Sequence, residues 1–118
     1  MLVRVTPSMQ EYLSDAIADS VAREAPQPTD GVYLKVHEAV KAAKRPGLTV
    51  TIVASAADLR ELASRANYEC GPGGVCDENI GWSSTPTDKA YWMARKRAYK
   101  ALLAQVETHI SHRPPRGA

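Results

Sequence analysis

The sequence has no phenylalanine, and only two of its 118 residues are cysteine. Without phenylalanine, the core has to be built from Leu, Val, Ile and Ala with a few Tyr and Trp, which favours closely packed helices. Two cysteines are compatible with a reducing, cytoplasmic setting, which is the one we expect. No signal peptide or membrane span is predicted either, because the strongest apolar run, LTVTIVASAA, is short and punctuated by threonines.

Motifs of specific chemistry are also missing. The chain contains no Walker A sequence, no GxGxxG, no HExxH and no GxSxG. The formal net charge of +2 is too mild to indicate nucleic-acid binding by itself. We therefore expect a protein that is not an enzyme and that needs no cofactor.

The longest helical signal covers residues 87–112. An apolar stripe at helical spacing runs along it, formed by Tyr91, Trp92, Ala98, Tyr99, Leu102, Leu103, Val106 and Ile110. Lys96, Arg97 and Lys100 form a basic edge outside this stripe. Arg95 lies inside it, so we expect a carboxylate from the first helix or from a second copy to pair with its guanidinium. One domain over residues 1–112 is predicted, followed by a disordered tail over residues 113–118.

Two units of a strand followed by helices make up the rest of the chain. The first has a strand at residues 2–5 and a helix that begins at a capping box of Ser8 and Glu11. A helix over residues 31–44, capped by Asp30, follows it. The second unit has a strand at residues 48–54 and a helix that begins at Ser55 and Asp58. The predicted fold is therefore mainly helical α+β, with four helices and a two-stranded sheet in the order β-α-α-β-α-α.

The strand at residues 48–54 needs a partner, because a single strand cannot satisfy its own backbone groups. It can pair with residues 2–5, with its own copy in a homodimer, or with a strand of another protein. On the first helix, Glu11, Asp15 and Asp19 are spaced four residues apart and form an acidic face. This face is either merely solvated or a patch for a basic partner, such as the last helix of a second copy.

The least ordinary stretch is a loop expected over residues 68–82, in which Cys70 and Cys76 bracket a GPGG turn. Three interpretations remain open: two reduced structural thiols, a disulfide, or a zinc site that adds His109 and His112. The helical rise places the two histidines far from the loop, which argues against zinc within one chain. Trp82 at the end of the loop is either an interface aromatic or, as we prefer, a plug that fastens the loop to the core.

The predicted function is a protein-interaction module that associates with itself. Its candidate interaction residues are Trp82, Arg95, Lys96, Arg97, Lys100, Glu11, Asp15 and Asp19. The alternatives are nucleic-acid binding through the basic last helix, and a small zinc or thiol-redox protein using Cys70 and Cys76. In its small size, its alanine- and arginine-rich composition and its strand-plus-capped-helix units, the chain resembles small proteins of actinobacterial phages. That resemblance implies a modulator or inhibitor of a host protein.

Overall fold

A computed structural model describes residues 1–111 and shows a mainly helical α+β fold with one two-stranded sheet, as predicted. The elements in chain order are β1 (Leu2–Val5), α1 (Pro7–Tyr12), α2 (Ser14–Ala22), the 3₁₀ turn η1 (Pro28–Asp30), α3 (Gly31–Ala42), β2 (Val50–Val53), α4 (Ala56–Cys70), α5 (Val75–Trp82) and α6 (Pro86–Ser111). The tail predicted over residues 113–118 lies outside the described residues, as does His112. Within the described chain, no helix has the length and apolarity that crossing a membrane requires.

The two strands pair with each other inside the chain, so the simplest of the three pairing alternatives is the one observed. They are antiparallel, with Val3 opposite Ile52 and Val5 opposite Val50. Burial alternates along both strands, because successive side chains of a strand point to opposite faces. Val3, Val5, Val50 and Ile52 face the core.

Side chains of helices cover both outer edges of this sheet. The side-chain amide of Gln105 on α6 bonds the outer edge of β1 as a neighbouring strand would. Its Oε1 accepts from the Arg4 N–H at 2.9 Å, and its Nε2 donates to the Arg4 carbonyl at 2.8 Å. His109 Nε2 lies 2.6 Å from the Leu2 carbonyl oxygen. On the other edge, Lys35 of α3 donates to the Val53 carbonyl. Covered edges keep a short sheet from pairing with other chains.

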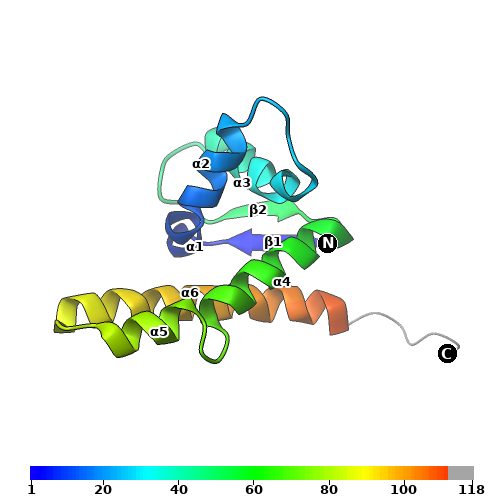
Figure 1. Ribbon diagram of the computed structural model, residues 1–118. Coiled ribbons are helices and arrows are strands. Elements are labelled where there is room, and N and C mark those ends of the chain that lie inside the picture. Colours follow the sequence, from blue (N-terminus) through cyan, green and yellow to red (C-terminus); the bar gives the residue numbers. More distant parts are fainter. Residues whose placement is uncertain (112–118) are drawn as a thin grey trace, which may run out of the picture.

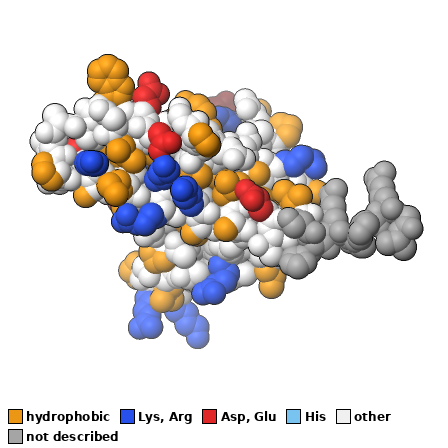
Figure 2. Space-filling view, turned by 90° about the horizontal axis from the view of Figure 1, so that it is seen from below, with side chains coloured by type: hydrophobic (Ala, Val, Ile, Leu, Met, Phe, Trp, Pro, Cys, Tyr) orange, Lys and Arg blue, Asp and Glu red, His pale blue; other side chains and the backbone are white. Residues whose placement is uncertain are grey.

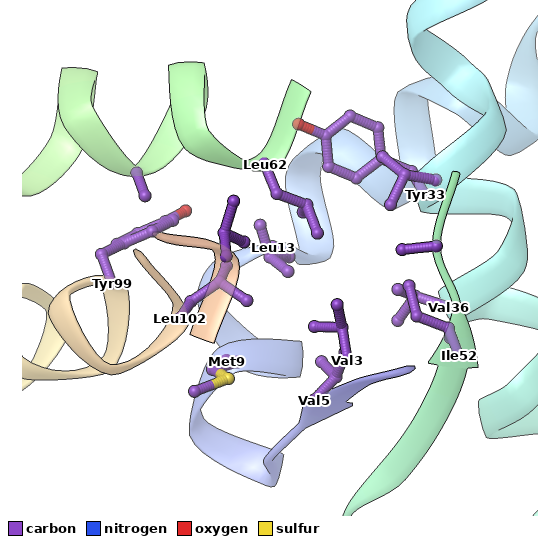
Figure 3. Close-up of a cluster of buried hydrophobic side chains, with 14 of the residues drawn as sticks. Val3, Val5, Met9, Leu13, Tyr33, Val36, Ile52, Leu62, Tyr99 and Leu102 are labelled. Carbon is purple, nitrogen blue, oxygen red and sulfur yellow. The ribbon is translucent and has the colours of Figure 1, made fainter. Parts of the chain in front are cut away.

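Figure 1 shows the sheet between α3 above and α6 below, with α4 crossing from the sheet towards α5. Side chains from β1, β2, α1, α3, α4 and α6 close on one core. In Figure 3, Leu13, Leu62 and Leu102 meet at its centre, with Val3 and Ile52 rising from the strands. Burying a leucine completely stabilises a fold by about 1.5–3 kcal/mol, so this cluster holds the elements in place.

The predicted first helix is divided in two. Leu13 separates α1 from α2, and its side chain is fully buried. The predicted capping box of Ser8 and Glu11 is wrong. Thr6 is the N-cap instead and accepts from the Met9 N–H, because Pro7 suits the first helical position.

The helix starts at Asp30 and at Ser55 differ from each other. At Ser55 the predicted box is confirmed, because its Oγ accepts from the Asp58 N–H at 3.1 Å and Asp58 accepts from the Ser55 N–H at 2.8 Å. Asp30 precedes α3 as predicted, but its carboxylate turns away from that helix. It accepts from the Gln27 N–H and from Ser20 Oγ, so it ties η1 to α2.

Residues 75–82 form the helix α5, where the sequence predicted a loop. The chain turns at Gly73, whose φ is +69°, and α5 begins after Gly74. Added Cβ atoms at Gly71 and Gly74 would lie 2.4 Å and 2.6 Å from backbone oxygens, so both positions need glycine. Helix α5 packs along the first half of α6, and together they form a hairpin that projects beyond the other elements in Figure 1. We call α5 with residues 86–95 the arm, and the rest the body.

Candidate interaction surfaces

Arg95 is the polar centre at the base of the arm. Its guanidinium forms a two-point ion pair with Glu69 of α4, with Nε to Oε2 at 3.0 Å and Nη2 to Oε1 at 2.6 Å. The Arg95 side chain is 16% exposed and that of Glu69 is 4% exposed. The predicted carboxylate partner is therefore present, but it comes from α4 and not from the first helix. Burial alone would lower the pKa of Arg95, but the bonds from Glu69 and Tyr91 raise it.

Aromatic rings surround the same guanidinium. Its carbon atom Cζ lies 5.1 Å from the ring centre of Trp92 and 5.8 Å from those of Tyr12 and Tyr99. The hydroxyl of Tyr99 donates to the Tyr12 carbonyl at 2.9 Å, which connects α6 to α1. Cation–π contact adds to the ion pair at this place. These rings therefore belong to an internal contact, which leaves Arg95 itself little surface for a partner.

The two cysteines are free thiols, and both are buried. Cys76 is the only buried residue of α5, and its Sγ lies 3.8 Å from Glu69 Oε2. Burial raises the pKa of Cys70, and burial together with the charge of Glu69 raises the pKa of Cys76 to about 11. A nucleophilic or redox thiol needs the opposite shift, because the thiolate is the reactive form. In the described chain the raised pKa values therefore favour the protonated, less reactive form of both thiols.

The zinc alternative would combine both cysteines with His109 and His112. His109 contacts β1, and the helical rise places it about 20 Å along α6 from Arg95, beside which Cys76 lies. His112 is outside the described residues. Among residues 1–111, no group of three or more His, Cys, Asp or Glu side chains is arranged to hold a metal ion.

The predicted basic edge of α6 divides into two kinds of residue. Lys96 pairs with Asp77 of α5, and this bond lowers the pKa of Asp77. It therefore fastens the arm. Arg97 and Lys100 are exposed, as is Lys89 on the same side of the helix. Figure 2 shows Lys and Arg side chains on the underside of the molecule, where α6 lies. We call Lys89, Arg97 and Lys100 the basic face.

The acidic residues Glu11, Asp15 and Asp19 are all exposed on α1 and α2, as predicted for a solvated or partner-binding face. An open groove lies between α2 and α3, and Asp15 and Asp19 come directly after its lining residues Ser14 and Ala18. The groove has a volume of about 430 Å³ and is lined by Gln10, Ser14, Ile17, Ala18, Val21, Ala22, His37 and Val40. Two aliphatic side chains at its margin are exposed to solvent: Val21 is 46% exposed and Val40 is 39% exposed.

Trp82 occupies the end of α5, next to the turn into α6. Its side chain is 82% exposed, the highest value among the large exposed hydrophobic residues of the described chain. The preferred prediction that it fastens the loop to the core is therefore wrong. The cause is the unforeseen helix: α5 turns Cys76 inward, so the opposite part of this short helix carries Trp82 to the solvent.

The groove was missed from the sequence. An apolar helix face normally packs inside, so Ile17 and Val21 gave no sign of an exposed groove. Leu13 and Ile17 pack against the main core, whereas Val21, one turn beyond Ile17 on α2, lies at the groove and is 46% exposed. Comparisons with models of protein families, with curated proteins and with solved structures found no match.

Proposed function

We propose that this protein is a non-enzymatic interaction module that binds a second copy of itself through the groove between α2 and α3. The observation that carries the proposal is the groove itself, an apolar hollow of about 430 Å³ that is open to solvent. An exposed apolar hollow rimmed by charged residues is typical of a protein-binding surface. The acidic and basic faces on one chain further favour contact between copies, since opposite charges steer association.

The experiment is sedimentation velocity on the full chain, from micromolar to millimolar concentration. The wild-type protein is expected to associate reversibly, and Val21→Glu is expected to weaken association at least tenfold by placing a charge in the groove. Because Val21 is 46% exposed, the variant is expected to keep the fold, which circular dichroism checks. Val53→Glu, at an exposed position on β2, is the matched control. A wild-type protein that stays monomeric at millimolar concentration would contradict the proposal.

A second candidate is nucleic-acid binding, which the exposed Lys89, Arg97 and Lys100 favour. The rings of Trp92 and Tyr99 are turned to Arg95, so phosphate contacts rather than base stacking would supply the affinity. Binding of this kind weakens steeply with salt. If Lys89→Glu with Lys100→Glu leaves the affinity and its salt dependence unchanged, this candidate falls. A host protein, implied by the resemblance to phage proteins, would compete for the groove.

A further inference from the structure

We propose that the occupant of the groove is Trp82 from the arm of the second copy. This inference rests on the proposed function and adds to it the residue that enters the groove. The contact is of the head-to-tail kind: the groove of one copy takes the arm of the other. Trp82 and the groove are both apolar and exposed, and in this contact each covers the other.

The chemistry of the two surfaces matches. Trp82 presents a large, flat apolar ring with one N–H group, and it is 82% exposed. The groove offers aliphatic walls from Ile17, Val21 and Val40, with polar atoms of Gln10 and His37 at the lining. Its volume of about 430 Å³ is within the range of pockets that hold ring-sized ligands. Tryptophans that enter such pockets dominate the binding energy of many interfaces.

The arm of the same chain does not supply this tryptophan. Helices α2 and α3 lie above the sheet in Figure 1, whereas α5 and α6 lie below it. The arm is also fixed in that position by the pairs Lys96–Asp77 and Arg95–Glu69. A tryptophan that reaches the groove has to come from another molecule.

The charges beside the two features are complementary. Asp15 and Asp19 are exposed on α2 and directly follow the lining residues Ser14 and Ala18. Lys89 of the basic face lies in the arm itself and Lys100 lies further along α6, and both are exposed. The helical rise separates these two lysines by about 16 Å, and it separates Asp15 from Asp19 by about 6 Å. The two faces therefore carry opposite charge.

Complementation of two variants tests the inference. Trp82→Ala has an intact groove and no ring, and Val21→Glu has an intact arm and a blocked groove. Each variant alone is expected to lose association at least tenfold, because every contact needs one arm and one groove. An equimolar mixture is expected to form a one-to-one complex in sedimentation velocity. Both positions are exposed, so circular dichroism should show native folds.

Tryptophan fluorescence provides a second readout of the same mixture. Only the Val21→Glu copy contributes Trp82, and Trp92 is common to both. The emission is expected to shift to shorter wavelength on mixing, because the indole leaves water. Charge exchange is a third test. Asp15→Lys with Asp19→Lys is expected to weaken binding, and a partner that carries Lys89→Glu with Lys100→Glu is expected to restore it. Glu107→Lys, at an exposed position near the other end of α6, is the control.

The outcomes separate this inference from the proposed function. If Trp82→Ala associates like the wild type while Val21→Glu does not, the groove binds another part of the second copy and the inference is overturned. A mixture of the variants that stays monomeric, although the wild type associates, overturns it as well. If the wild type shows no association at all, the proposed function fails together with it.

Discussion

In the body, side chains from two strands and four helices close on one apolar core, whereas charged and polar contacts fasten the arm. The buried cluster includes no residue of α5, although Cys76 is fully buried. The arm depends on Arg95–Glu69 and Lys96–Asp77 instead. An apolar core resists change cooperatively, while polar fastenings can be removed one at a time. The difference indicates that the body supplies most of the stability, whereas the arm carries the exposed Trp82.

The largest effect should come from the body. Leu102→Ala removes a fully buried side chain and is expected to lower the free energy of unfolding by about 2–5 kcal/mol. Urea denaturation measures this loss. Leu103→Ala, at the half-buried neighbouring position, is the control and should cost clearly less. If Ile80→Ala in the arm costs as much as Leu102→Ala, the contrast between the two regions is wrong.

Removing the fastening at the base of the arm should have the next largest effect. Arg95→Met leaves the buried Glu69 carboxylate without its partner, which costs about 3 kcal/mol. Arg97→Met, at an exposed position of the same helix, should change stability by less than about 0.5 kcal/mol. The labelling rate of Cys76 by a thiol reagent should also rise, because Cys76 contacts Glu69. Equal labelling rates in both variants would show that the pair does not hold the arm.

The thiol of Cys76 should make the arm sensitive to alkali. Its pKa is about 11 in the fold against about 9 without it, so the folded chain keeps a proton that the unfolded chain loses. Stability is therefore full below pH 9 and falls as the pH rises towards 11. The loss should be on the order of 1 kcal/mol after solvent screening. Between pH 8 and pH 10, the free energy of unfolding should fall less with rising pH in Cys76→Ala than in the wild type. Tyrosine ionisation affects both proteins alike.

The smallest expected effect concerns the edge of the sheet. Gln105→Ala removes the two hydrogen bonds to the Arg4 backbone and should cost about 1 kcal/mol. Gln105→Glu keeps the acceptor and loses the donor. Its loss of stability should lie between zero and that of Gln105→Ala, to which repulsion between the new carboxylate and the Arg4 carbonyl adds. Glu107→Ala, at an exposed position two residues further along α6, is the control. Equal unfolding midpoints for Gln105→Ala and Glu107→Ala would show that the edge is not held by this side chain.

Local signals predicted the regular parts of the fold. The Ser55 box predicted the start of α4, and the long apolar stripe predicted α6. Helix α5 was missed because eight residues with a glycine near the end show no clear stripe. The start of α1 was also misassigned, since Thr6 and Ser8 are both good caps and only Pro7 decides between them.

The site was predicted less well, because it depends on which helix faces which. The sequence marked Arg95 as a charge inside an apolar stripe but named the wrong helix as its partner. Glu69 had the matching signal: it continues the stripe of Leu59, Leu62 and Ala66 on α4. Two opposite charges that each interrupt an apolar stripe are natural partners. The exposure of Trp82 had no such signal, because it follows from the direction of α5.

The contacts of Gln105 and His109 with β1 join residues 101 and 107 positions apart in the chain. During synthesis, β1 leaves the ribosome first and can pair with β2 once that strand has emerged. Its outer edge stays open until the second half of α6 has been made. Open strand edges recruit other chains, and partly made proteins aggregate through them. For a nascent chain, the interval between β2 and the end of α6 is therefore one in which this strand edge is exposed to other chains.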